Sequence, residues 1–202
     1  MVNQYSWRWV TVVKIGFIVE GETEALILDS DNFKAILGKL NIVSVGIINA
    51  GGNKNLLPHN ILIHQANLIK KEAEKIVILT DLDDDLCITK TRERITERDN
   101  QIIVVAIKQI EAWFLADSTL LCHLFNESFI FDYPENENVP FDTLRALLIQ
   151  FTGRGLPRKV PMAQKMINSG FSIENAANHP NCPSANYFLT KLKQCASIKA
   201  IE

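Results

Sequence analysis

Short runs of β-branched and other apolar residues alternate along the chain with segments in which apolar residues recur every three or four positions. The first run covers residues 12–19 (VVKIGFIV), and similar runs cover residues 42–49, 76–80 and 102–107. Their length and their Val and Ile content predict four strands. The run at residues 76–80 (IVILT) is apolar up to its last residue, which is typical of a strand buried on both faces.

A segment with helical spacing follows each predicted strand. These segments cover residues 25–40, 55–74, 89–98 and 111–125. Thr23 lies just before the first segment and is the predicted N-cap of that helix. The regular alternation of strand and helix predicts an α/β fold, with a parallel sheet of about four strands flanked by helices.

The pattern changes after residue 125. Residues 126–140 (NESFIFDYPENENVP) are rich in turn formers and acids and predict an exposed excursion. A helix over residues 141–151, a basic loop with Gly and Pro over residues 152–161, and short helices follow. We therefore divide the chain into an α/β domain, residues 1–125, and a helical C-terminal extension or cap, residues 126–202.

Charge is unevenly distributed along a chain of ordinary globular composition. The 202 residues are 47% hydrophobic and 22% charged, with a formal net charge of −2. Residues 1–144 hold 13 Lys and Arg against 21 Asp and Glu, whereas residues 145–202 hold 8 against 2. An acidic body with a basic C-terminal part indicates an anionic partner that needs both a metal site and positive counter-charge.

Several features predict a cytoplasmic protein that does not enter a membrane. The four cysteines lie far apart and form no CxxC pair, so we expect reduced thiols. The N-terminal residues lack the layout of a signal peptide, and no run of 18 apolar residues occurs.

Acidic residues follow three of the four predicted strands. Glu20 follows the first strand, Asp81 and Asp83 follow the third, and Glu111 follows the fourth. Ligands of doubly wound sheets bind beyond the carboxyl ends of the strands, and clustered carboxylates suit Mg²⁺ or Mn²⁺. In an extended segment, Asp81 and Asp83 would point to the same side. Asp83 and Asp85 offer a second register, and acids near helix starts can also simply complement the helix dipole.

Three motifs resemble those of a known family. Residues 20–24 (EGETE) end the first predicted strand and residues 81–83 (DLD) end the third. Together they resemble the TOPRIM domain, a Rossmann-like metal-binding fold of topoisomerases, bacterial primases and the overcoming-lysogenization-defect (OLD) nucleases. Residues 110–117 (IEAWFLAD) are similar to a block of an uncharacterised bacterial TOPRIM-like group, and residues 159–192 resemble that group more loosely.

The resemblance implies roles for individual residues. Glu20 would be the acid/base residue or a metal ligand, and Asp81 and Asp83 would bind Mg²⁺ or Mn²⁺. Glu24 would be a ligand of a second metal ion. Glu111 matches the similar block, and its position at a strand end makes it a further candidate ligand, whereas its role within the group is not implied.

Basic residues that could contact phosphates form two sets. The first set follows the acidic residues 81–85. Alternatively, it belongs to a solvated helix face and pairs with neighbouring glutamates. The second set surrounds the Gly/Pro loop in a part of the chain with almost no acids. The candidates are Arg92 and Arg94 in the first set, and Arg154, Arg158, Lys159 and Lys165 in the second.

Two functions follow from these features. The first is a metal-dependent nuclease or related phosphoryl-transfer enzyme that acts on DNA or RNA, for which the resemblance implies a role in phage defence. The second is a non-catalytic effector or sensor that binds metal or nucleic acid and works with a partner protein, such as the product of a neighbouring gene. Either could form oligomers.

Overall fold

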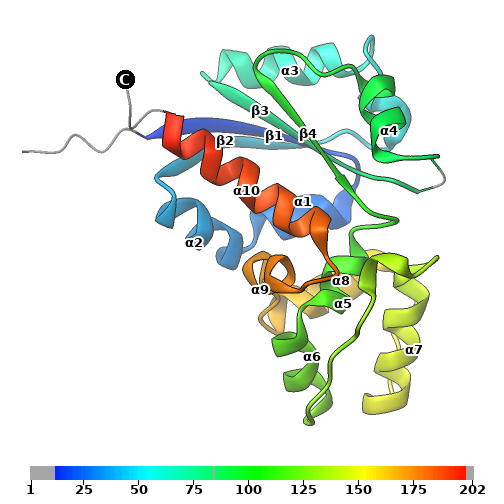
Figure 1. Ribbon diagram of the computed structural model, residues 1–202. Coiled ribbons are helices and arrows are strands. Elements are labelled where there is room, and N and C mark those ends of the chain that lie inside the picture. The colour runs from blue at the N-terminus through cyan, green and yellow to red at the C-terminus, as the bar shows by residue number, and fades with distance from the viewer. Residues whose placement is uncertain (1–11, 84, 199–202) are drawn as a thin grey trace, which may run out of the picture.

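The centre of the fold is a parallel β-sheet. The computed structural model describes residues 12–83 and 85–198. Its four strands lie in the order β2-β1-β3-β4 (Figure 1). The strands are β1 (Val13–Val19), β2 (Ile42–Asn49), β3 (Lys75–Asp81) and β4 (Gln101–Ala106). The predicted fold class is confirmed, because an all-parallel sheet flanked by helices is an α/β, Rossmann-like arrangement.

Helices cover both faces of the sheet. Successive strand residues point to opposite faces, so Phe17 and Leu79 belong to one hydrophobic cluster while Ile18 and Ile78 belong to another. Figure 1 shows the helices of the first face below the sheet and those of the second face above it. The first face carries α1 (Glu22–Asp29), α2 (Asp31–Lys39) and α10 (Pro183–Ile198), and the second carries α3 (Ile61–Lys70) and α4 (Ile88–Ile95).

The strand order creates a switch point between β1 and β3. From β1 the chain passes to β2 on one side, and it then crosses to β3 on the other side of β1. Val19 is in register with Leu79, and the backbone N–H of Glu20 donates to the Leu79 carbonyl at 3.0 Å. The residues that follow these two strands therefore lie side by side, at the position where ligands of such sheets bind.

The C-terminal half adds a group of helices beyond β4. They are α5 (Glu111–Ala116), α6 (Ser118–Phe125), the 3₁₀ helix η2 (Pro134–Asn136), α7 (Pro140–Thr152), α8 (Lys159–Asn168) and α9 (Ile173–Asn178). Phe17 of β1, Trp113 of α5, Met162 of α8 and Phe188 of α10 share one hydrophobic cluster. The division after residue 125 stays a prediction. Within the described ranges, no helix has the length and apolar character needed to cross a membrane.

Two predicted helices are each divided in two. The helix predicted over residues 25–40 breaks at Ser30, whose extended backbone and Oγ cap α2 by accepting from the Phe33 N–H at 3.3 Å. The helix predicted over residues 111–125 breaks at Asp117, which accepts from the Leu120 N–H at 3.0 Å. Both breaks follow from side chains that satisfy free backbone N–H groups at a helix start.

Other predicted boundaries also shift. Gly21, and not Thr23, is the N-cap of α1, and Thr23 is buried within that helix. A short 3₁₀ helix, η1 (Asn53–Leu56), precedes α3, because Pro58 disfavours helical backbone at the residue before it. At the other end of the chain, α8 begins at Lys159, inside the predicted basic loop.

The predicted exposure of residues 126–140 is wrong for Pro134, Glu135 and Pro140, which are buried. One oxygen of the Glu135 carboxylate accepts hydrogen bonds from the backbone N–H of Ser184, at 3.0 Å, and from its hydroxyl. The same hydroxyl accepts from Trp113 Nε1 at 2.7 Å. This network joins η2, α5 and α10, which are distant in sequence, so the local composition could not reveal it.

Candidate functional site

Acidic residues from three segments line a cavity of about 270 Å³ at the switch point between β1 and β3. We call it the carboxylate cavity and define it by Glu20, Glu24, Asp81, Glu111 and Lys159. The carboxylates follow β1, end β3 and begin α5, whereas the lysine is the first residue of α8. Four of the acids predicted from the sequence therefore lie together.

Hydrogen bonds hold Glu20 and Asp81 in place. Glu20 Oε2 accepts from the Thr80 hydroxyl and from the Asp81 N–H, the latter at 3.3 Å. Asp81 Oδ1 accepts from the Ile110 N–H at 2.8 Å, which ties the end of β3 to the start of α5. Burial raises the pKa of the Asp81 carboxyl well above its usual range, and the nearby charges of Glu24 and Glu111 raise it further.

Glu24 is a buried acid in the first turn of α1. Its side chain is 4% exposed, and Oε2 accepts from the Gly21 N–H at 3.1 Å. Burial is the main cause that raises its pKa to about 7, with further contributions from Glu20 and Glu111. The hydrogen bond from the Gly21 N–H stabilises the start of α1, whereas burial in the cavity disfavours the charged form of Glu24.

Among the described residues, Glu111 and Lys159 form the ion pair of the carboxylate cavity. Lys159 Nζ lies 3.2 Å from Glu111 Oε2, and the Lys159 side chain is 41% exposed. Glu111 itself is fully buried, and its Oε1 has no hydrogen-bond partner among the described residues. Burial raises the pKa of Glu111, and the positive charge of Lys159 only partly offsets this effect. The pKa of Lys159 is also raised, because the negative charges of Glu111 and Asp81 outweigh the effect of burial, which lowers it.

The donor set of the carboxylate cavity suits a hard divalent cation. The oxygens are carboxylates, and the unpartnered Glu111 Oε1 is an acceptor that a cation could satisfy. In the described ranges, no three Asp, Glu, His or Cys side chains are already placed to hold a metal ion together. Glu20, Glu24, Asp81 and Glu111 could hold Mg²⁺ or Mn²⁺ after adjustment of their side chains.

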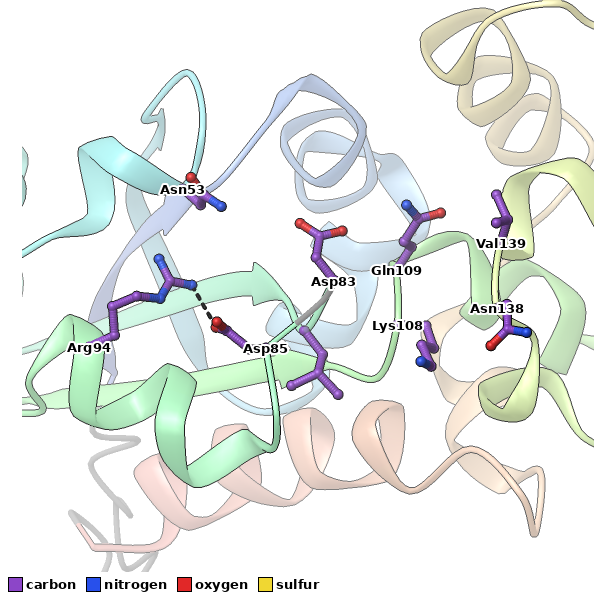
Figure 2. Close-up of a pocket in the computed structure, with 9 residues that line it drawn as sticks. Asn53, Asp83, Asp85, Arg94, Lys108, Gln109, Asn138 and Val139 are labelled. Carbon is purple, nitrogen blue, oxygen red and sulfur yellow. Dashed lines mark hydrogen bonds and ion pairs between the residues drawn. The ribbon is translucent and has the colours of Figure 1, made fainter.

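Asp83 and Asp85 line a different, neighbouring cavity of about 670 Å³. The expectation that Asp81 and Asp83 share an extended segment is wrong, because Asp83 has a left-handed backbone with φ of 46°. Its N–H donates to the Lys108 carbonyl at 2.9 Å, so the chain turns after β3. Figure 2 shows Asp83 between Arg94 on one side and Gln109 on the other.

We call this second space the carboxamide cavity. It is defined by Asn53, Gln109 and Asn138 together with Asp83, Asp85, Arg94 and Lys108. Arg94 pairs with Asp85 at 3.0 Å (Figure 2), and the hydrogen bond from Thr91 is the main cause that lowers the pKa of Asp85, followed by Arg94. Sequence reasoning missed Lys108, Gln109 and Asn138. The first two lie two and three residues after the end of β4, which was the available signal.

The remaining predicted basic residues lie outside both cavities. Arg92 Nε donates to the Ile103 carbonyl at 3.3 Å, and its guanidinium lies 4.8 Å from the centre of the Tyr187 ring. This contact favours a structural role for Arg92. Arg154 and Arg158 are exposed before α8, and Lys165 is half-buried within it. Of the second basic set, Lys159 is the residue that the structure brings to the carboxylates.

Comparison of the chain with protein-family models, with curated proteins and with solved structures yields no match. The resemblance to the TOPRIM domain therefore stays a prediction that rests on the quoted motifs.

Proposed function

We propose that this chain is a divalent-metal-dependent nuclease or a related phosphoryl-transfer enzyme acting on nucleic acid. One observation carries the proposal: four carboxylates and one lysine from four segments share a cavity at the switch point of a parallel sheet. Three of these carboxyls have raised pKa values, chiefly because burial disfavours their charged forms, and perturbed pKa values of this kind cluster at functional sites. Such an arrangement is typical of a site that binds cations and anionic substrates.

In this proposal, Asp81 and Glu20 are the main metal ligands, and Glu24 and Glu111 complete the set. The bound ion would neutralise charge on the phosphodiester and lower the pKa of a water molecule. Among the described residues, Glu20 accepts hydrogen bonds through Oε2, so Oε1 is available to take or give a proton at the reacting phosphate. Lys159, which is partly exposed, could contact a phosphate oxygen.

The exposed cations near α8 supply longer-range attraction. Arg154 and Arg158 precede Lys159 in a part of the chain with few acids. They would draw the nucleic-acid backbone toward an otherwise acidic cavity, and this attraction would weaken with salt. We assign them to substrate binding and not to the chemical step.

A cleavage panel tests the proposal. The substrates are single- and double-stranded DNA, RNA and tRNA, each with Mg²⁺, Mn²⁺ or EDTA. We expect metal-dependent cleavage that Asp81→Asn and Glu20→Gln abolish while folding is retained. Asp99→Asn is the matched control, because Asp99 is an exposed aspartate outside both cavities, and it should cleave like the wild type.

The alternative is a non-catalytic module that binds metal or nucleic acid for a partner protein. The observation that favours it is the exposure of Arg154 and Arg158, which could attract a nucleic-acid backbone without any chemical step. Nucleic-acid binding without cleavage of any substrate, alone or with the product of a neighbouring gene, would reject the nuclease and favour this module.

A further inference from the structure

The side chains that line the carboxamide cavity can recognise a ligand by the hydrogen-bonding groups along its edge. Asn53, Gln109 and Asn138 come from three separate segments, and each offers both a donor and an acceptor. Gln109 Oε1 and Arg94 Nε are buried without a hydrogen-bond partner among the described residues. Buried polar atoms without partners are costly, so a ligand that pairs with them gains affinity.

The formal charges of the carboxamide cavity balance, because Asp83 and Asp85 oppose Arg94 and Lys108. Asp85 and Arg94 neutralise one another at 3.0 Å. Lys108 has no ion pair within the described ranges and is half-buried, so its ammonium group is available to an anionic group. Leu82 and Val139 add apolar surface. A planar heterocycle with polar edges and an attached phosphate matches this combination of surfaces.

The two cavities are neighbours along three stretches of chain. Gly52 lines the carboxylate cavity and Asn53 the carboxamide cavity, and the same holds for Asp81 and Asp83. In the same way, Ile110 lines the carboxylate cavity and Gln109 lines the carboxamide cavity, shortly after β4. A nucleotide bound in the carboxamide cavity would therefore place its backbone next to the carboxylates.

We propose that the carboxamide cavity binds one unpaired nucleotide of the substrate, with Gln109 and Asn138 on the edge of the base and Lys108 on its phosphate. Asn and Gln side chains form paired hydrogen bonds with base edges, most often with adenine. The base must be unpaired, because a concave cavity of about 670 Å³ cannot admit a base inside a duplex. This inference rests on the proposed function only in that the substrate is a nucleic acid.

The test measures binding without cleavage. The full chain in metal-free buffer is titrated with AMP, GMP, CMP and UMP, and with ribose 5-phosphate, by calorimetry or NMR. We expect one nucleotide to bind more tightly than the others and than ribose 5-phosphate. Gln109→Ala and Asn138→Ala should each weaken the binding of that nucleotide by about 5- to 100-fold, the range for one base-edge contact. Both variants should also discriminate less between bases.

Gln150→Ala is the matched control, because Gln150 is an exposed carboxamide of α7 outside the cavity. Asn138 is exposed, so Asn138→Ala should fold even if Gln109→Ala does not. Equal binding of all four nucleotides and ribose 5-phosphate, or no effect of either cavity variant, would overturn the inference.

The two proposals fail in different ways. Base-selective binding that depends on Gln109 and Asn138, without cleavage of any substrate, supports the inference and rejects the nuclease. Metal-dependent cleavage with nucleotide binding indifferent to both variants supports the nuclease and rejects the inference.

Discussion

Glu24 makes the stability of the metal-free protein depend on pH. The residue is 4% exposed, and the pKa of its carboxyl rises from 4.5 to about 7 on folding, chiefly through burial. Glu24→Gln removes the charge but keeps a side-chain oxygen that can accept from the Gly21 N–H, as Glu24 Oε2 does at 3.1 Å. The substitution therefore separates the electrostatic cost of Glu24 from its role at the α1 start.

The sign of the effect follows from proton linkage. Between pH 4.5 and about 7 the folded chain keeps a proton on Glu24 that the unfolded chain has lost, so the unfolding free energy falls as pH rises. At 1.36 kcal/mol for each unit of pKa, the full loss above that window is about 3 kcal/mol. Asp81 and Glu111 also have raised pKa values and contribute with the same sign.

Urea denaturation at pH 5 and pH 8, in EDTA, measures the effect. We expect wild-type protein to be more stable at pH 5, and Glu24→Gln to recover up to about 3 kcal/mol at pH 8, equivalent to roughly 6 to 12 °C in Tm for a chain of this size. Glu22→Gln is the matched control, because Glu22 lies in the same turn of α1 and lines the same cavity but is exposed. An unchanged pH dependence in Glu24→Gln, or an equal change in Glu22→Gln, would refute the reasoning.

Three further predictions concern stability. Lys159→Met removes the ion-pair partner of buried Glu111 and should lower the unfolding free energy by roughly 1–3 kcal/mol at pH 8. The loss should shrink as the pH falls, because protonation removes the charge of Glu111, whose pKa burial raises; denaturation at pH 8 and pH 5 checks this. Gly16→Ala would place its Cβ 2.8 Å from Leu68 Cδ1 and should cost about 1–3 kcal/mol, with partial recovery in the double variant with Leu68→Val. Ser184→Ala deprives two buried groups of a hydrogen bond, and thermal unfolding should show a loss of about 1–3 kcal/mol.

The strands and the meeting of Glu20 with Asp81 could be predicted from the sequence. Runs of β-branched residues define the strands, and the carboxyl ends of parallel strands share one edge of the sheet. The position of Asp83 could not be predicted, because it depends on one residue with left-handed backbone, φ 46°. The contact between Glu111 and Lys159 joins residues 48 positions apart and requires α8 to pack against α1.

The helix breaks show a limit of a different kind. Apolar residues keep helical spacing across Ser30 and across Asp117, so periodicity alone predicts continuous helices. Asp117 also accepts from the Ser172 N–H at 2.9 Å and from Asn175 Nδ2 at 3.1 Å. Partners more than 50 residues away help fix this break, and no local pattern contains them.

The position of α10 has a consequence for how a cell makes this protein. Phe188 of α10 packs against Phe33 and Trp113, with ring centres 5.8 Å and 5.6 Å apart, over one face of the sheet. A ribosome releases all four strands before it has made this helix. Until then Phe33 and Trp113 lack their contacts with Phe188, and hydrophobic surface exposed in this way makes a partly synthesised chain prone to aggregation. Lys159 also follows all four strands in the chain, so the carboxylate cavity is completed only after the strands have been synthesised.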